Sequence, residues 1–185
     1  MNLDDKNCRR RECIFQALHD ALAEMEYPDL TIEEIAARAK VGKSTIYRWW
    51  QHKADLVMDV FRESTMSIFD LDFEQGLEQN LNQQLGRLAE VLHQPIGRAM
   101  LVVIANHREQ AARFFSQYLL PRREQMRVLI QQAVQRQEIR DGYDYDLMLD
   151  TLYAPIHYQI IFFNNLPDAA YIQRLVQLAL APVRL

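Results

Sequence analysis

The chain has 185 residues, of which 49% are apolar, and its formal net charge at pH 7 is −4. This length accommodates one large domain or two smaller ones, and the apolar share can fill a hydrophobic core. The N-terminus carries no signal-peptide pattern and no window approaches about 18 uncharged apolar residues, so the sequence predicts a cytoplasmic protein without a membrane span.

The composition predicts an all-α fold of about nine helices. The chain has five glycines and six prolines, and good helix formers such as Ala, Leu, Gln, Glu and Arg dominate it. The first predicted helix covers about residues 6–26, where apolar side chains recur at helical spacing, and Tyr27-Pro28-Asp29 ends it. Its cysteines, Cys8 and Cys13, lie too close to one end for a disulfide framework and are interpreted as incidental thiols.

Residues 31–50 have the dimensions of a helix-turn-helix. Thr31 followed by Glu34 is a capping-box pattern and predicts a short second helix. A tight turn follows at residues 40–42, in which we expect Gly42 to supply a positive φ. A third short helix is expected from about Lys43 to residue 49.

The rest of the chain predicts further helices and a regulatory half. A fourth helix should run from residue 54 to about 67–69, and we place a domain boundary at its start, with no flexible linker. The DNA-binding domain then covers residues 1–53 and a ligand-binding and dimerisation domain covers residues 54–185. Later helices are expected at about 74–93, 96–107, 109–137 with an interruption near Pro121, 145–164 and 168–181.

The distribution of charge indicates a basic patch that the net charge hides. All four lysines lie in the first 53 residues, and residues 38–53 hold five basic side chains and no acidic one. Such a local field attracts a polyanion. A second basic run, from Lys6 through Arg9 to Arg11, is either a solvated arm or an arm that contacts DNA.

In a helix-turn-helix the second helix enters the major groove with its N-terminal residues toward the bases. We therefore expect Lys43, Ser44 and Thr45 to address bases, while Ile46 and Trp50 turn toward the core. Phosphate contacts are expected from Thr31, Tyr47, Arg48 and Lys53. The role of Trp49 stays open between a phosphate contact and surface packing, and Arg48 is alternatively a base reader or a solvated charge. The predicted DNA-binding residues are Thr31, Lys43, Ser44, Thr45, Tyr47, Arg48, Trp49 and Lys53.

The stretch "TIEEIAARAKVGKSTIYRWWQHKADLV", residues 31–57, resembles the DNA-binding segment of the TetR family of transcriptional regulators. The likeness covers roughly 45 residues without gaps. Two features depart from the family pattern: Lys40-Val41-Gly42 replaces the usual Gly-Val-Ser, and Trp49 replaces a commoner His or Tyr. The positions that carry the likeness are Thr31, Ile35, Ala36, Ala39, Val41, Thr45, Ile46, Tyr47, Trp50, Lys53 and Leu56.

The C-terminal half is similar to one subgroup of that family, through Asp150, Leu152, Pro155, Ile156 and Tyr158. The resemblance implies a homodimer through the last two helices, paired with their mates in a four-helix bundle, and an interior that binds a small molecule. An apolar stripe is expected at that dimer interface rather than inside one chain. It consists of Leu149, Leu152, Tyr153, Ile156, Ile160 and Phe163, with Leu175, Leu178 and Ala179 behind it.

A small, largely apolar effector would need a few polar groups to orient it. Side chains with an apolar body and a polar tip in the C-terminal half are the candidates. No metal or cofactor is expected, because the histidines lack ligand spacing with one another or with carboxylates. The predicted effector-binding residues are Asn106, His107, Tyr118, Tyr153 and His157.

These features predict a ligand-responsive transcriptional regulator that binds a near-palindromic DNA operator as a homodimer, most often as a repressor. One alternative is a DNA-binding adaptor whose C-terminal half only dimerises. Another is a helical enzyme, for which no Cys–His, Ser–His or paired-carboxylate cluster stands out.

Overall fold

The computed structural model describes the backbone of residues 3–185 and the side chains of residues 9–185. This part of the chain is helical, as predicted. It forms two compact units. The first comprises Met1–Glu63 with Gln94–Ala112, and the second comprises Ser64–His93 with Arg113–Leu185. Among the described residues, no single helix is both long enough and apolar enough to cross a membrane.

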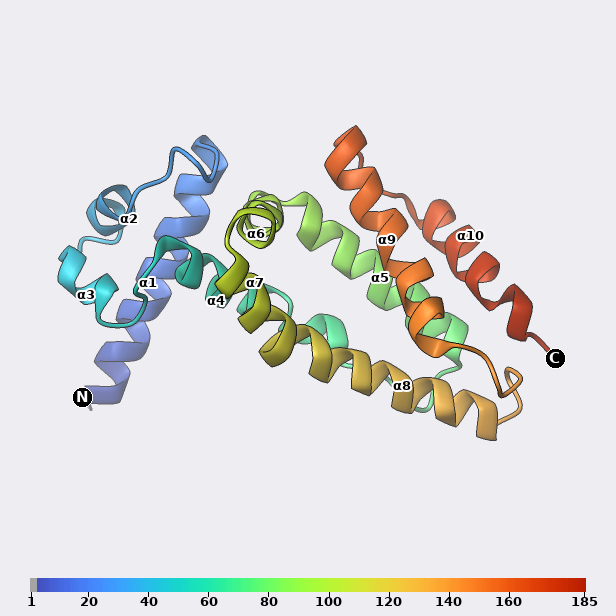
Figure 1. The fold of residues 1–185 in the computed structure, drawn as a ribbon. Helices are drawn as coiled ribbons and strands as arrows, with labels where there is room; N and C mark the ends of the chain where they lie inside the picture. Colours follow the sequence, from blue (N-terminus) through green and yellow to red (C-terminus); the bar gives the residue numbers. More distant parts are fainter. Residues whose placement is uncertain (1–2) are drawn as a thin grey trace. The chain divides into compact units, whose positions relative to one another are not determined.

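The first unit holds the predicted helix-turn-helix. It contains α1 (Leu3–Glu24), α2 (Ile32–Arg38), α3 (Lys43–Tyr47), α4 (Lys53–Ser64) and α6 (Pro95–Asn106). Helix α1 packs against both α2 and α6, and α2 and α3 lie together on one side of α1 (Figure 1). Two predicted ends were too late: α3 stops at Tyr47, and α4 stops at Ser64 and is followed by a 3-10 turn, Met66–Phe69.

Polar side chains at the ends of α2 fix this helix in place. Thr31 Oγ1 accepts a 3.1 Å hydrogen bond from the backbone N–H of Glu34, as the capping pattern predicted. At the other end, Arg38 donates to Glu34 and Glu24, each at 2.7 Å. Because Glu24 is the last residue of α1, Arg38 joins the end of α2 to the end of α1.

The basic run near the N-terminus is helical rather than a loose arm. Arg9, Arg10 and Arg11 belong to α1 and are exposed. Arg11 lies 4.7 Å from the Phe15 ring and 3.7 Å from an Asp59 carboxylate oxygen. The helix continues through this run because its apolar side contacts the core from Ile14 onward. The Lys6 side chain lies outside the described residues.

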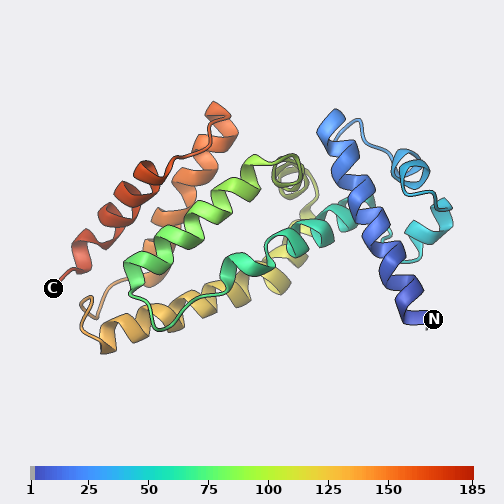
Figure 2. The ribbon, with the colours of Figure 1, turned by 180° about the vertical axis from the view of Figure 1, so that it is seen from behind.

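The second unit is built around α5 (Leu77–His93). Helix α5 contacts α8 (Leu120–Gln135), α9 (Tyr145–Phe163) and α10 (Ala169–Leu180), and so forms the centre of the unit (Figures 1 and 2). The C-terminal 3-10 turn, Ala181–Val183, continues directly from α10, and the Val183 carbonyl accepts a 2.7 Å hydrogen bond from the N–H of Arg140. These helices agree with the predicted ranges to within a few residues.

The interruption predicted near Pro121 is a wide helical turn. Helix α7 (Arg108–Phe114) continues into a π-helical turn, Phe115–Leu119, which leads directly into α8. Pro121 lacks an N–H and its ring excludes the carbonyl four residues earlier, so the regular α-helical pattern cannot pass through it. The backbone N–H of Leu120 bonds instead to the carbonyl of Phe115.

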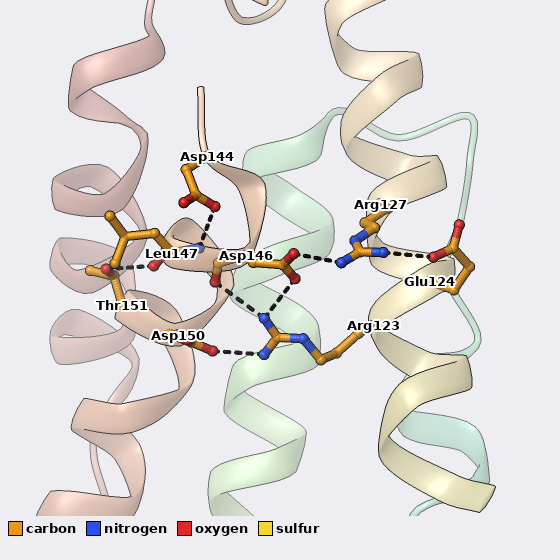
Figure 3. A network of polar contacts seen from close by, with 8 residues as sticks. All are labelled: Arg123, Glu124, Arg127, Asp144, Asp146, Leu147, Asp150 and Thr151. Atoms are coloured by element: carbon orange, nitrogen blue, oxygen red, sulfur yellow. Dashed lines mark hydrogen bonds and ion pairs between the residues drawn. The ribbon is translucent and has the colours of Figure 1, made fainter. Parts of the chain in front are cut away.

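A charged network holds the first turns of α9 against α8 (Figure 3). Arg123 donates to Asp150 at 2.7 Å and to Asp146 at 2.8 Å. Arg127 bonds to the second carboxylate oxygen of Asp146 and, at 3.1 Å, to Glu124. Arg123 is largely covered, with 18% of its side chain exposed.

The apolar stripe predicted at a dimer interface is mostly core of its own chain, so that prediction was wrong for most of its members. Leu149, Leu152 and Ile156 are each 0% exposed. They lie on the side of α9 that faces the other helices of its unit, which repeats every third or fourth residue. Ile160, Leu175 and Ala179 are buried too, and Tyr153 is half-buried, whereas Phe163 and Leu178 remain exposed.

Candidate nucleic-acid interface

Two apolar side chains, one on α3 and one just after it, anchor this helix to the core. Ile46 is 0% exposed and Trp50 is 4% exposed, which confirms that both face the core. The Trp50 indole N–H donates to Asp59 of α4 at 2.9 Å, and its ring lies 5.8 Å from that of Phe15. The buried indole therefore meets its hydrogen-bonding requirement while it joins the segment after α3 to α1 and α4.

The opposite side of α3 is open to solvent. Lys43, Ser44, Tyr47 and Arg48 are exposed, and Tyr47 has 48% of its surface accessible. Thr45 is partly covered. These side chains offer positive charge, hydroxyl groups and a phenol, which are the groups that bind phosphate oxygens and base edges. The basic and hydroxyl residues predicted for DNA contact on α3 thus share one accessible surface.

The two adjacent tryptophans divide between the core and the surface. Trp49 is partly exposed and packs edge-to-face on Trp50, with ring centres 5.4 Å apart. The guanidinium of Arg48 lies 5.4 Å from the Trp49 ring. Trp49 therefore supports Arg48 by a cation–π contact, and either side chain stays available to a phosphate group.

Lys43 is paired with an acidic residue that sequence reasoning missed. Its ammonium lies 2.9 Å from Glu33 on α2, and both side chains are more than half exposed. The hydrogen bond from Lys43 lowers the pKa of Glu33. Glu33 precedes the basic segment 38–53 in sequence, and the turn between α2 and α3 brings it beside Lys43. An exposed pair of this kind is weak, so a phosphate group can replace Glu33.

Lys53, which was predicted to contact phosphate, forms hydrogen bonds to the backbone of its own unit. Its ammonium donates to the carbonyl of Tyr27 at 2.6 Å and also to the carbonyl of Leu30. It lies 4.2 Å from the centre of the Tyr27 ring, and burial lowers its pKa. Lys53 thus fixes the segment that leads into Thr31. An ammonium group has a third N–H, so the phosphate contact stays a prediction.

Thr31 remains suited to its predicted role. Its oxygen accepts the capping bond from Glu34, while its hydroxyl proton is available to donate to an anion. The side chain is exposed at the start of α2.

The turn between α2 and α3 differs from the prediction. Gly42 has an ordinary φ of −72°, and the positive φ, 54°, belongs to Lys40. The backbone N–H of Val41 bonds to the Ala36 carbonyl and that of Lys40 to the Ala37 carbonyl, which is the Schellman pattern. That pattern requires the left-handed conformation at residue 40, so the expectation for Gly42 was wrong.

The predicted effector-binding residues are divided between the two units. Asn106 and His107 belong to the first unit, where the Asn106 amide donates to the Val102 carbonyl at 2.9 Å and His107 contacts Tyr27. The other three, Tyr118, Tyr153 and His157, belong to the second. The structure therefore does not place all five within one unit.

Tyr118 and Tyr153 each have a partner inside the second unit. The Tyr118 hydroxyl donates to buried Thr65, and the Tyr153 hydroxyl donates to Gln84 at 3.0 Å. Burial raises the pKa of Tyr153 far above its usual range, so this phenol is neutral. Gln84 is 1% exposed, and its amide nitrogen has no partner in the described part of the chain. Sequence reasoning missed Gln84, because one glutamine on a helix gives no signal of burial.

Comparison with known proteins gives matches over both halves of the chain. Residues 14–60 match the family model "Bacterial regulatory proteins, tetR family", and residues 74–179 match "Tetracyclin repressor-like, C-terminal domain". The HTH-type transcriptional regulator YdeS of Bacillus subtilis is 28% identical over 94% of this chain and 89% of its own length. The regulator Rv1556 of Mycobacterium tuberculosis is 30% identical over 87% of this chain and 81% of its own length.

Solved structures show the same fold. The crystal structure of the TetR family transcription regulator SCO0332 superposes with a TM-score of 0.72 at 22% identity, covering 93% of this chain and 97% of that one. A second regulator, SCO0520 from Streptomyces coelicolor, gives a TM-score of 0.60 at 20% identity, with 94% and 98% covered.

Proposed function

Because this chain belongs to the TetR family of helix-turn-helix transcriptional regulators, we propose that it represses transcription as a homodimer bound to a near-palindromic operator. The observation that carries the proposal is that α3 has two different sides: Ile46, with Trp50 just after the helix, is buried, whereas Lys43, Ser44 and Tyr47 are exposed. In this arrangement Lys43, Ser44 and Thr45 read bases. Thr31, Tyr47, Arg48, Trp49 and Lys53 hold the phosphate backbone and set the register.

Phosphate contacts give this proposal a quantitative test. Each phosphate that the protein neutralises contributes about 0.9 to the slope of log affinity against log salt. A Lys53→Met variant should therefore bind operator DNA more weakly and with a slope smaller by about one. Tyr47→Phe should bind more weakly at an unchanged slope, because it loses a neutral hydrogen bond. An unchanged slope for Lys53→Met would remove this residue from the phosphate contacts.

Exposed apolar side chains support a dimer through the last two helices. Tyr158, Ile161 and Phe162 of α9 are 52%, 55% and 71% exposed, and Leu178 of α10 is 68% exposed. Tyr158 and Phe162 lie one turn apart, with ring centres 5.0 Å from each other. Large apolar surface of this kind is typical of a protein interface. The proposed dimer thus uses the outer side of α9 rather than the stripe that the chain buries itself.

Light scattering tests the dimer. Phe162→Glu places a charge on the proposed interface and should convert the dimer to a monomer, whereas Met66→Glu, at a residue that is 66% exposed on a different element, should leave it unchanged. Dimeric Phe162→Glu protein would contradict this interface.

We also propose that a small effector bound in the C-terminal half releases the protein from DNA. The polar groups of Tyr118, Tyr153 and Gln84 support the second unit as its binding region, with His157 of the same unit as a further candidate. The other two predicted residues, Asn106 and His107, lie in the first unit and are not part of this proposed region. The effector must prefer the conformation that does not bind DNA, and the coupling between the two ligands is then reciprocal. Effector binding should shift α4 and change the spacing of the two reading helices.

A further inference from the structure

A groove in the second unit lies between α5 and the start of α10. Its volume is about 530 Å³, which falls in the range of small-molecule sites, roughly 300–1,000 Å³. One side is formed by Asn82, Gly86 and Glu90, which lie one turn apart along α5. The other side comes from the segment after α9 and the first turn of α10. None of the predicted DNA-binding or effector-binding residues lines it.

Gly86 leaves the floor of this groove open. It lies in the interior of α5, where glycine stabilises a helix less than alanine does. A Cβ atom built on Gly86 would meet no atom within 4 Å. Packing within the chain therefore does not require a glycine here, and the missing side chain leaves room for an occupant above the helix.

The charged side chains of the groove are acidic, while Asn82 and Gln173 contribute amides. Glu90 and Asp168 contribute carboxylates, and none of the described residues that line the groove is basic. Asp168 uses one carboxylate oxygen to cap α10, at 2.7 Å from the N–H of Tyr171. The Asn82 amide donates to the Glu78 carbonyl at 2.8 Å, and its own oxygen has no donor in the described part of the chain. An occupant that brings positive charge and N–H donors would complement this set.

The remaining lining is apolar. Leu166 is 41% exposed, and Ile172 lies behind it at the start of α10. Together with the open space over Gly86, the exposed part of Leu166 forms an apolar surface that an alkyl chain can cover.

We propose that this groove binds a small organic ammonium ion that carries an apolar chain. The ammonium group lies toward Glu90 and Asp168, and the chain lies over Gly86 against Leu166. The proposed site does not depend on the proposed regulation. Its test measures ligand binding to the protein alone, without DNA.

The test is an NMR titration of the deuterated, ¹⁵N-labelled protein with octylammonium and, separately, with octanoate. The two ions have the same chain length and opposite charge. The chemical shift of the Gly86 amide should change on addition of octylammonium. The affinity for octanoate should be at least about tenfold weaker, because the carboxylates repel its charge. Equal shifts with both ions, or no shift at Gly86, would overturn the proposal.

Variants locate the site. Gly86→Met places a side chain in the open space, where its Cβ meets no atom within 4 Å. It should abolish the octylammonium response while the protein stays folded, as its thermal unfolding curve will verify. Gln79→Met, at an exposed position on the same helix that does not line the groove, should bind as before. Glu90→Gln should weaken binding several-fold, whereas Glu109→Gln removes an equal charge elsewhere and should not. If Gly86→Met changes the oligomeric state and leaves octylammonium binding intact, the groove is a contact between two copies and the proposal is wrong.

Discussion

The Tyr27 hydroxyl lies 3.2 Å from Nε2 of His107, with the two rings edge-to-face at 88°. This contact joins the segment after α1 to the residue that ends α6. Lys53 continues the connection, because its ammonium lies against the Tyr27 ring and bonds to the Tyr27 carbonyl. A change at the end of α6 can therefore reach the start of α4 and the segment before Thr31 through three side chains.

This contact should appear as an energetic coupling between Tyr27 and His107. Tyr27→Phe and His107→Ala should each lower the free energy of unfolding, and the double variant should lose less than the sum of the two. We expect a coupling of about 0.5–1.5 kcal/mol, the usual range for one hydrogen bond. Urea denaturation of the four proteins measures it, and strict additivity would show that the hydrogen bond contributes nothing.

The backbone at Lys40 should be strained, and a glycine at this position should relieve the strain. Its φ of 54° is unfavourable for a residue with a Cβ. Lys40→Gly should raise the free energy of unfolding by about 0.5–1 kcal/mol, after the extra entropy of glycine in the unfolded chain is subtracted. Lys40→Ala keeps the Cβ and serves as the control. An equal gain for both variants would assign the effect to the lost charge instead.

Glu33 should weaken DNA binding, because it occupies Lys43 and adds a negative charge beside α3. Glu33→Gln should therefore bind operator DNA about two- to fivefold more tightly, which corresponds to the energy of one exposed ion pair. Fluorescence anisotropy at fixed salt measures the change. Glu26→Gln removes an exposed carboxylate from the same unit and should have a smaller effect. Unchanged affinity of the Glu33 variant would mean that Lys43 does not contact DNA.

The network between α8 and α9 should make the free energy of unfolding fall at acidic pH. Hydrogen bonds from Arg123 and Arg127 lower the pKa of Asp146. The unfolded carboxyl has a pKa of about 3.9, so the stabilisation is complete above that value and is lost as the pH falls toward the lower pKa of the folded state. Asp146→Asn should unfold more easily at pH 7 and show a smaller loss of stability between about pH 5 and pH 2. Asp70→Asn, at an exposed position in the same unit, should keep the acid dependence of the unaltered protein.

Sequence patterns predicted the parts of this fold that depend on local spacing. The capping pair Thr31 and Glu34, the inward Ile46 and Trp50, and the helices of the C-terminal half all follow from periodicity and turn residues. Lys40 escaped prediction because a Schellman turn is set by where α2 ends, and Gly42 was the residue whose type favours positive φ.

Long-range contacts escaped prediction for a different reason. The partners of Lys53 are backbone carbonyls 23 and 26 residues away, and no side-chain pattern marks a carbonyl. The apolar residues of α9 exceed what one buried face requires, and periodicity does not say which face the chain itself covers. Leu149 and Phe163 therefore belong to the same predicted stripe, although one is 0% and the other 60% exposed.

The most direct test of DNA recognition by α3 is selection of bound DNA from random oligonucleotides, followed by footprinting of the enriched sequence. We predict two inverted half-sites with centres about 34–36 Å apart or slightly more, one for each α3 of a dimer. Ser44→Ala and Thr45→Ala should relax base preference within the half-sites and leave their spacing unchanged. If no sequence is enriched, or if both variants select the same bases with the same affinity, then α3 does not read the operator.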